Sequence, residues 1–265
     1  MKVTIIGVGN IGGAIARGLV KGGTYNASDI TISDLVQNNL DKLKAFDPGF
    51  TISASNSLAI KEADVVIVAV KPWIVETVLS EIKHSFNYEK QILVSIAAGV
   101  SFDMLNGFMK SKVNTTAPTI FRVIPNTAIE VLSSMTFVSS CNATAEEEAL
   151  IVQMFNELGT ALLIKEDLMA AGTALASSGI AYALRYIRAS CEGGVQMGFY
   201  PDQAKEIVLK TVKGAVDILL ANQTNPEQEI DRVTTPGGIT IRGLNEMELA
   251  GFSSSVIRGL LKSSK

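Results

Sequence analysis

The sequence predicts an α/β domain with a parallel sheet, followed by an all-α domain, and three observations lead to this prediction. Short apolar runs alternate with helical patterns through about the first 160 residues. A glycine-rich motif directly follows the first apolar run. Beyond about residue 163 the strand patterns stop and helical patterns continue. The expected domain limits are therefore 1–162 and 163–265.

The expected strands are short, rich in β-branched residues and mostly without alternation of polar and apolar positions. Such strands, separated by helices, are typical of a parallel sheet that helices cover on both faces. A capping box of Thr144 and Glu147 predicts the start of a helix over 144–159. The other expected elements of this half are strands at 2–8, 29–34, 50–53, 65–70, 91–99, 121–124 and 135–140, and helices at 14–23 and 38–46.

The second half is predicted to be helical and to need a partner. Residues 167–198 form one expected helix, or two that meet at a serine–glycine step, and 202–222 form another. From Ala170 to Ala181 nearly every residue is Ala, Gly, Ser or Thr, which permits close helix approach but buries little surface. We therefore expect this domain to complete its core in a second subunit.

Composition narrows the classes of function. Apolar residues make up 47% of the chain, and the formal charge of −3 does not favour nucleic acid. The apolar runs are shorter than the roughly 18–20 residues of a membrane span, and glycines break the N-terminal run. We expect a cytoplasmic protein without a membrane segment. Cys141 and Cys191 match no metal spacing, so no metal is expected.

The motif GVGNIG at 7–12 predicts a nucleotide site, because an expected strand precedes it and an expected helix follows it. Gly7 permits a tight turn, Gly9 leaves room for a pyrophosphate, and Gly12 lets the helix approach the strand. The N–H groups at the start of that helix then face the phosphates. The first domain is thus predicted to be a Rossmann-type dinucleotide-binding domain.

Asp34 ends the second expected strand, about 20 residues after Gly12, where an acid commonly binds the ribose 2′-hydroxyl. A carboxylate there repels a 2′-phosphate, and no arginine follows it. This favours NADH over NADPH, although Ser33 and Lys42 offer groups that suit a phosphate.

Two later strand ends are expected beside the glycine turn, where open α/β sheets bind ligands. The fourth strand ends in Lys71-Pro72, and the proline fixes the backbone as it leaves the sheet. The fifth ends in the small residues of 95–101, which would let a nicotinamide ring approach the backbone.

The chemistry is expected to be hydride transfer to an imine. The single histidine, His84, lies in a polar stretch and is interpreted as a surface residue, so an acid–base pair is lacking. A protonated C=N bond already attracts hydride, so the protein needs only to orient the substrate, place charge around it and offer one hydroxyl near the nitrogen. The helix N-terminus predicted after Thr-Thr-Pro-Gly-Gly suits a substrate carboxylate, through free N–H groups of Gly238, Ile239 and Thr240, with hydroxyls of Thr235 and Thr240.

Together these motifs resemble pyrroline-5-carboxylate reductase over essentially the whole chain. The resemblance rests on GVGNIGGAIARGL, AVKP, SIAAGVS, RVIPNT at 122–127, the stretch at 173–182 and VTTPGGITIRGL. It implies reduction of L-1-pyrroline-5-carboxylate to L-proline by NAD(P)H, the last step of proline synthesis. It also implies an all-α C-terminal dimerisation domain that forms a homodimer, and often a decamer of five dimers.

The resemblance implies a role for particular residues. Thr240 is expected to hydrogen-bond the substrate ring nitrogen, and Asn56 to contact the adenosine. The substrate turn is expected to comprise Thr235, Gly238, Ile239 and Thr240. The other expected cofactor residues are Gly7, Gly9, Asn10, Ile11 and Gly12 at the pyrophosphate, Ser33 and Asp34 at the ribose, Ala69, Val70, Lys71 and Pro72 along the dinucleotide, and Ala97 near the nicotinamide.

Three departures from the family pattern bear on these expectations. Leu35 stands where the family has an arginine or similar residue, which opposes the family's usual preference for NADPH. Ile180 replaces the proline of Ser-Gly-Ser-Gly-Pro-Ala-Tyr, so a more regular helix is expected. Thr235 replaces the serine of the substrate turn and keeps its hydroxyl.

Two other readings remain open from the sequence. A related imine or 3-hydroxyacid reductase would use the same scaffold, but the hydroxyacid enzyme should carry a catalytic lysine or histidine early in the helix after the domain junction. Residues 167–181 contain neither. A protein that senses NAD(P)H without turnover would not need the Pro-Gly-Gly turn.

Overall fold

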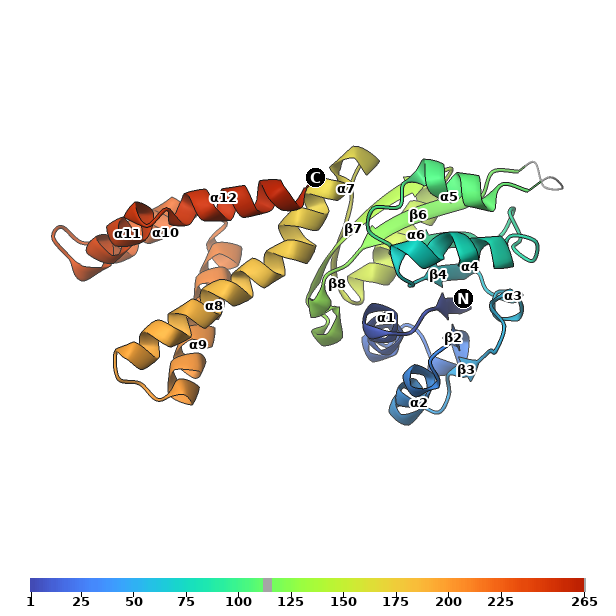
Figure 1. The fold of residues 1–265 in the computed structure, drawn as a ribbon, viewed down its shortest axis with the longest axis horizontal. Coiled ribbons are helices and arrows are strands. Elements are labelled where there is room, and N and C mark those ends of the chain that lie inside the picture. Colours follow the sequence, from blue (N-terminus) through green and yellow to red (C-terminus); the bar gives the residue numbers. More distant parts are fainter. Residues whose placement is uncertain (112–115, 265) are drawn as a thin grey trace. The chain divides into compact units, whose positions relative to one another are not determined.

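One eight-stranded sheet organises residues 1–177 in the computed structural model, which describes residues 1–111 and 116–264 (Figure 1). The strand order is β3-β2-β1-β4-β5-β6-β7-β8, and all neighbours run parallel except β6 and β7. The order from β3 to β6 is that of a Rossmann fold, which confirms the predicted α/β class. The strands are β1 (Val3–Ile6), β2 (Ile30–Ser33), β3 (Thr51–Ile52), β4 (Val65–Val68), β5 (Ile92–Ser95), β6 (Thr119–Ile124), β7 (Ser134–Cys141) and β8 (Gly159–Leu163).

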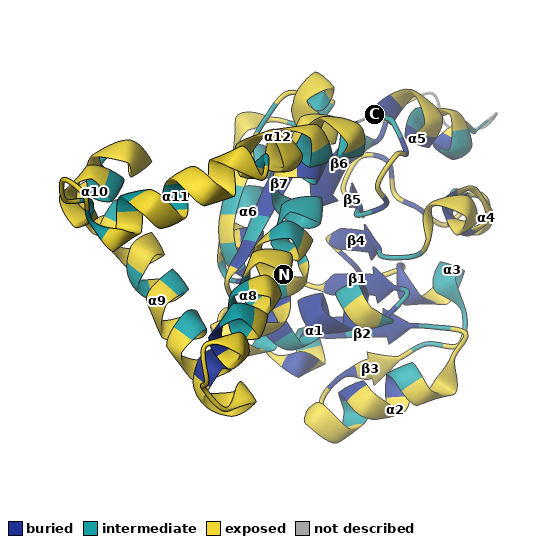
Figure 2. Ribbon diagram, turned by 60° about the vertical axis from the view of Figure 1, so that its left-hand side comes forward, coloured by how far each residue is buried: buried dark blue, intermediate teal, exposed yellow. Residues whose placement is uncertain are grey.

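Helices bury both faces of this sheet. Every residue of β1, β4 and β5 is buried, as their continuous apolar runs predict (Figure 2). Ile5 and Ile67 belong to the core that α1, α2 and α6 cover, and Val66 and Leu93 to the core beneath α4 and α5. The helices are α1 (Asn10–Gly22), α2 (Gln37–Phe46), α3 (Asn56–Ala59), α4 (Val75–Ile82), α5 (Phe102–Met109) and α6 (Ala145–Asn156).

The capping box predicted at the start of α6 is confirmed. The Glu147 N–H donates to the Thr144 hydroxyl at 3.2 Å, and the Thr144 N–H donates to the Glu147 carboxylate at 2.7 Å. Two otherwise unpaired donors of the first turn are satisfied in this way. The acidic side chains of 146–148 add favourable charge at the positive end of the helix dipole.

The sheet unit continues past its last strand. The strands end at Leu163, close to the sequence-based domain limit, whereas the compact packing unit extends to Ser177. Met169 is buried against Ile124 and Phe137, so the first turn beyond the sheet belongs to this core. The α7 helix (Met169–Gly172) therefore forms part of the first unit.

The helix that was expected to be regular around Ile180 is regular from Gly179 onwards but not before it. Residues Thr173–Ser178 form a π-helix between α7 and α8 (Gly179–Gln196). The Ser177 hydroxyl donates to the Pro125 carbonyl at 3.0 Å, which ties this wide turn to the loop after β6. Loss of the proline thus does not make the segment uniformly α-helical.

The second unit, from Ser178 to Ser263, is entirely helical and carries few buried residues (Figure 2). The helix that contains Gly194 and the helix that contains Ala204 pack closely. A Cβ added at Gly194 would lie only 2.9 Å from the Ala204 Cβ, so glycine permits this approach. Within the described ranges, no helix has the length and apolar character needed to cross a membrane. The remaining helices are α9 (Pro201–Asn222), α10 (Pro226–Val233), α11 (Ile239–Leu249) and α12 (Phe252–Ser263).

Candidate active site

The glycine turn lies between β1 and α1, and its geometry explains the motif. Gly7 has a φ of +87°, which favours glycine, and its N–H donates to the Ser33 carbonyl at 2.7 Å. A Cβ at Gly12 would lie 1.9 Å from the Gly7 carbonyl oxygen, so the helix needs a glycine there. A Cβ at Gly9 would meet no described atom within 4 Å. The space beside Gly9 therefore fits a pyrophosphate held against the backbone.

The start of α1 offers donors to such a group. Gly9 is the N-cap residue, and no side chain caps the helix. The first-turn N–H groups of 10–12 thus point out of the helix end, where an anion binds well. Further along, Arg17 donates to both carboxylate oxygens of Glu130, at 3.1 and 2.5 Å. This pair anchors α1 and lowers the pKa of the Glu130 carboxyl through hydrogen bonding to the guanidinium.

Asp34 has a structural task that its position in the sequence did not indicate. Its Oδ2 accepts the Val8 N–H of the glycine turn at 2.8 Å, and its Oδ1 accepts the Val36 N–H at 2.7 Å. Asn39 also donates to Oδ2, at 3.2 Å. The carboxylate thus joins the glycine turn to the start of α2 and lies at the end of β2, where the ribose was expected. Leu35 beside it is fully exposed.

A chain of polar side chains continues from β2 to α4. The Ser33 hydroxyl donates to the Asn56 side-chain oxygen at 2.8 Å, and the Asn56 amide donates to Glu81 at 2.9 Å. The structure therefore brings Ser33 and Asn56 together, as the resemblance implies. Glu81 was missed by the sequence analysis, because it lies on a helix 25 residues beyond Asn56 and matches no motif. Glu81 is therefore a second carboxylate, besides Asp34, near the carboxyl end of β2.

Ala69 and Val70 bring the end of β4 against the glycine turn. The Ala69 N–H donates to the Ile6 carbonyl at 2.7 Å, which continues the pairing of β1 and β4. A Cβ at Gly7 would lie 2.7 Å from Val70 Cγ1, so these residues form one wall of the turn.

The remaining cofactor candidates follow the same edge. Lys71 and Pro72 follow β4 and are exposed, and Pro72 begins a 3-10 turn over Pro72–Ile74. Ala97 follows β5 and is buried. All the cofactor residues predicted from the sequence thus lie at or near the carboxyl ends of neighbouring parallel strands, the place where open α/β sheets bind ligands.

The predicted substrate turn lies in the helical unit, between α10 and α11. Gly237 has a φ of +71°, which favours glycine, and a Cβ at Gly238 would lie 2.5 Å from the Thr235 hydroxyl oxygen, which would have to rotate away. Thr235, Ile239 and Thr240 are exposed.

One expectation about this turn is wrong. The Gly238 N–H is not free, because it donates to the Thr235 carbonyl at 2.9 Å. Gly238 is the N-cap of α11 and has no side-chain cap. The donors that this helix end offers are therefore the first-turn N–H groups of Ile239 and Thr240. A carboxylate placed there also gains from the helix dipole.

Arg242 on α11 donates from its Nε to the Gly238 carbonyl at 3.4 Å, so one cation lies at the predicted substrate turn. His84 is exposed and lies just beyond the end of α4, as the sequence analysis expects of a surface residue. Among residues 1–111 and 116–264, no cluster of histidine, cysteine or carboxylate side chains could hold a metal ion.

A comparison of sequences decides the family. The chain is 36% identical to "Pyrroline-5-carboxylate reductase 2" of Dictyostelium discoideum, over all of its own length and 91% of that relative. The chain belongs to the pyrroline-5-carboxylate reductase family. It is also 37% identical to "Pyrroline-5-carboxylate reductase 1" of the same organism, of which it spans about half, 48%, while 99% of the chain is covered.

Family models and a solved structure agree with this assignment. Residues 166–265 match the model described as pyrroline-5-carboxylate reductase dimerisation, and residues 2–99 the one described as NADP oxidoreductase coenzyme F420-dependent. The structure of Plasmodium falciparum pyrroline carboxylate reductase with NADP bound superposes with a TM-score of 0.89 at 26% identity. The match covers 100% of this chain and 95% of that one. The fold of a reductase of this family, with its helical dimerisation domain, is thus present over the full chain.

Proposed function

We propose that this protein reduces L-1-pyrroline-5-carboxylate to L-proline with hydride from a reduced nicotinamide dinucleotide. The observation that carries the proposal is that one member of the reductase family has both a site for a dinucleotide and a site for a substrate carboxylate. One is the glycine turn with open space at Gly9 and uncapped donors on α1. The other is the uncapped N-terminus of α11 beside Thr235 and Thr240.

The α/β unit holds the cofactor in this proposal. The first-turn donors of α1 bind the pyrophosphate, and the residues at the end of β2 bind the adenosine ribose. The loop after β5, which contains Ala97, lies against the nicotinamide. NAD(P)H, when bound, supplies the hydride that reduces the imine carbon.

The turn before α11 holds the substrate. The N–H groups of Ile239 and Thr240 bind the substrate carboxylate, and the Thr240 hydroxyl donates a hydrogen bond to the ring nitrogen. These donors fix the orientation of the ring and stabilise the negative charge of the carboxylate. The imine carbon accepts hydride, and the ring nitrogen takes up a proton along its hydrogen bond with the Thr240 hydroxyl. This chemistry needs no histidine, which agrees with the exposed position of His84.

Steady-state kinetics with pyrroline-5-carboxylate and either NADH or NADPH test the proposal. We expect oxidation of the reduced cofactor that depends on the imine, with one L-proline formed for each cofactor oxidised. Cofactor binding without turnover would instead identify a sensing protein. Turnover of 3-hydroxyacids but not of the imine would identify a different reductase on this scaffold.

The finer proposal is that NADH is the preferred cofactor. Asp34 lies at the end of β2, and Glu81 lies beside Asn56 through a 2.9 Å hydrogen bond, so two carboxylates flank the expected ribose position. A 2′-phosphate there would meet negative charge without an arginine after β2 to offset it. The ratio of kcat/KM for the two cofactors tests this preference.

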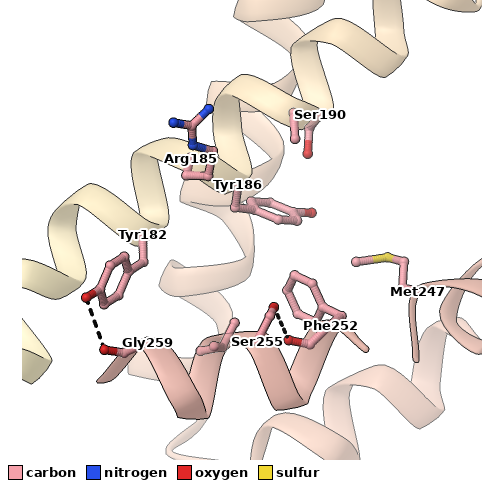
Figure 3. Close-up of a pocket in the computed structure, with 10 residues that line it drawn as sticks. Tyr182, Arg185, Tyr186, Ser190, Met247, Phe252, Ser255 and Gly259 are labelled. Atoms are coloured by element: carbon pink, nitrogen blue, oxygen red, sulfur yellow. Dashed lines mark hydrogen bonds between the residues drawn. The ribbon is translucent and has the colours of Figure 1, made fainter. Parts of the chain in front are cut away.

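We also propose a homodimer built through the helical unit, with a decamer of five dimers as the larger assembly. A groove of about 540 Å³ runs along α8 and α12, with Tyr182 and Tyr186 on one side and Phe252 on the other (Figure 3). The Tyr186 and Phe252 rings meet edge to face at 6.3 Å. An apolar helix of a second copy fits this chemistry, and sedimentation of the wild-type protein measures the assembly.

A further inference from the structure

A carboxylate outside the residues described so far connects three segments of the α/β unit. Glu166 begins the 3-10 turn Glu166–Leu168 that follows β8. Its Oε1 accepts the backbone N–H of Phe102 at 2.7 Å and the Nη1 of Arg122 at 2.7 Å. Phe102 is the first residue of α5, and Arg122 lies on β6. One oxygen atom therefore joins segments that are 64 and 44 residues away along the chain.

The position of this carboxylate is tightly constrained. The side chain of Arg122 is 10% exposed, and a buried cation needs a paired anion. Glu166 is the ion-pair partner that the described residues provide for it. The guanidinium also lies over the Phe102 ring, 5.8 Å from its centroid. The ion pair with Arg122 therefore holds Glu166 at the Phe102 N–H, and the contact of the guanidinium with the Phe102 ring holds Arg122 in turn.

The Phe102 N–H marks the far end of the loop that follows β5. At the near end, the Ile96 N–H donates to the Val68 carbonyl at 3.2 Å. At the far end, the Ser101 hydroxyl caps α5 by accepting the Met104 N–H at 3.3 Å. Between these anchors, Ala98 and Gly99 are exposed. The bond to Glu166 is thus a polar contact that fixes the far end of loop 96–101 to the rest of the unit, beside the buried side chains of Val100 and Phe102.

We propose that Glu166 is a positioning residue that holds loop 96–101 against the nicotinamide end of the cofactor. This inference rests on the proposed function, in which Ala97 of this loop faces the nicotinamide. In this proposal Glu166 acts through the loop and contacts neither substrate nor cofactor. The adenosine residues Ser33 and Asn56 lie at the ends of β2 and β3, which β1 and β4 separate from β5. Loss of Glu166 should therefore disturb one end of the dinucleotide and leave the other intact.

Binding of NADH and of ADP-ribose to the full-length protein, measured by calorimetry, separates the two ends. ADP-ribose contains the adenosine and the pyrophosphate but lacks the nicotinamide. We expect Glu166→Ala to weaken NADH about 10-fold and ADP-ribose less than about 2-fold, since one charge-assisted hydrogen bond is lost at the nicotinamide end. With the imine present, kcat should fall by about 10-fold or more, because small misplacements of the reacting groups slow hydride transfer strongly.

Two further variants test the role of the hydrogen bond. Glu166→Gln keeps an oxygen for the Phe102 N–H, so NADH affinity should return to within about 3-fold of wild type. The double variant Arg122→Met, Glu166→Met removes both charges and leaves no unpaired buried ion, which guards against misfolding. It should show the same selective loss for NADH as Glu166→Ala. Asp103→Ala, an exposed carboxylate on the first turn of α5, is the matched control and should bind both ligands normally.

The outcomes distinguish this inference from the proposed function. Equal weakening of NADH and ADP-ribose in Glu166→Ala would show a general structural role and overturn the inference. Unchanged NADH binding and kcat in that variant would overturn it as well. A wild-type protein that binds neither ligand would refute the proposed function, and the inference would fall with it.

Discussion

Asp34 shows how one side chain at the end of a strand serves both the fold and the choice of ligand. Its two oxygens accept the N–H groups of Val8 and Val36, so the carboxylate fixes the glycine turn from one side. The same charge lies where the ribose 2′-position is expected and opposes a phosphate there. A substitution that removes the charge but keeps an acceptor separates these two effects.

Asp34→Asn is expected to raise the ratio of kcat/KM for NADPH to that for NADH by about 10-fold, because one repulsive charge near the 2′-phosphate is lost. Asparagine retains an oxygen for one of the two backbone donors, whereas alanine would leave both without an acceptor. Glu62→Gln is the control, since Glu62 pairs with Lys2 at the surface. An unchanged ratio in Asp34→Asn would mean that this carboxylate does not face the ribose.

The glycines of the turn predict two distinct mutant phenotypes. Gly9→Ala should leave the free energy of unfolding within about 0.5 kcal/mol of wild type, because its Cβ meets open space, but should weaken NADH binding by occupying the pyrophosphate position. Gly12→Ala should destabilise the protein by about 3 kcal/mol or more, because its Cβ would overlap the Gly7 carbonyl oxygen. Denaturant unfolding and NADH titration of both variants check this. Equal stability of the two would contradict it.

Thr240 is the residue whose loss should affect chemistry most directly. Thr240→Ala is expected to lower kcat by roughly 10- to 100-fold, because the positioned hydroxyl at the ring nitrogen is lost. Thr240→Ser keeps the hydroxyl and should retain most of the activity. Since Thr240 is exposed, both variants should fold normally. Wild-type turnover in Thr240→Ala would remove this hydroxyl from the mechanism.

At the scale of elements, the strands that could be predicted are those buried on both faces. β1, β4 and β5 are continuous apolar runs because helices cover both sides of the sheet. β8 was missed because it lies at the sheet edge with most of its residues partly or fully exposed, so its sequence lacks that signature. The helices α4 and α5 were not identified either. Each has only eight residues, which is too short for a clear helical period.

The capping box of α6 allows a test at this scale. Thr144→Ala is expected to lower the free energy of unfolding by about 1 kcal/mol, because the Glu147 N–H loses its acceptor and the reciprocal bond loosens. Gln153→Ala, at an exposed position in the middle of the same helix, should change stability by less than about 0.5 kcal/mol. Chemical denaturation measures both. A Thr144→Ala variant as stable as Gln153→Ala would show that the cap contributes little.

At the scale of the whole molecule, the two sites could be predicted from the sequence, but the long-range contacts that support them could not. GVGNIG and Thr-Thr-Pro-Gly-Gly are local motifs, in which neighbouring residues build the geometry. Glu81 and Glu166 act on residues far along the chain, and single acidic residues on a helix or turn have no pattern that reveals their partners. The Gly238 N–H was misjudged for a related reason. A turn bond to Thr235 depends on backbone conformation that the residue types alone do not determine.

The exposed apolar surface of the helical unit leads to a prediction about assembly. Leu184 on α8 is 58% exposed, and α9, α11 and α12 also carry exposed large apolar side chains, more than a stable monomer would leave in water. Leu184→Asp places a charge on this surface and should shift the protein from dimer or larger assembly towards monomer, because an unpaired carboxylate in an apolar interface is costly. Val131→Asp, at a position in the α/β unit that is 70% exposed, should leave the assembly unchanged. Sedimentation velocity at several protein concentrations distinguishes these results. Dissociation by Val131→Asp but not by Leu184→Asp would place the interface on the α/β unit instead.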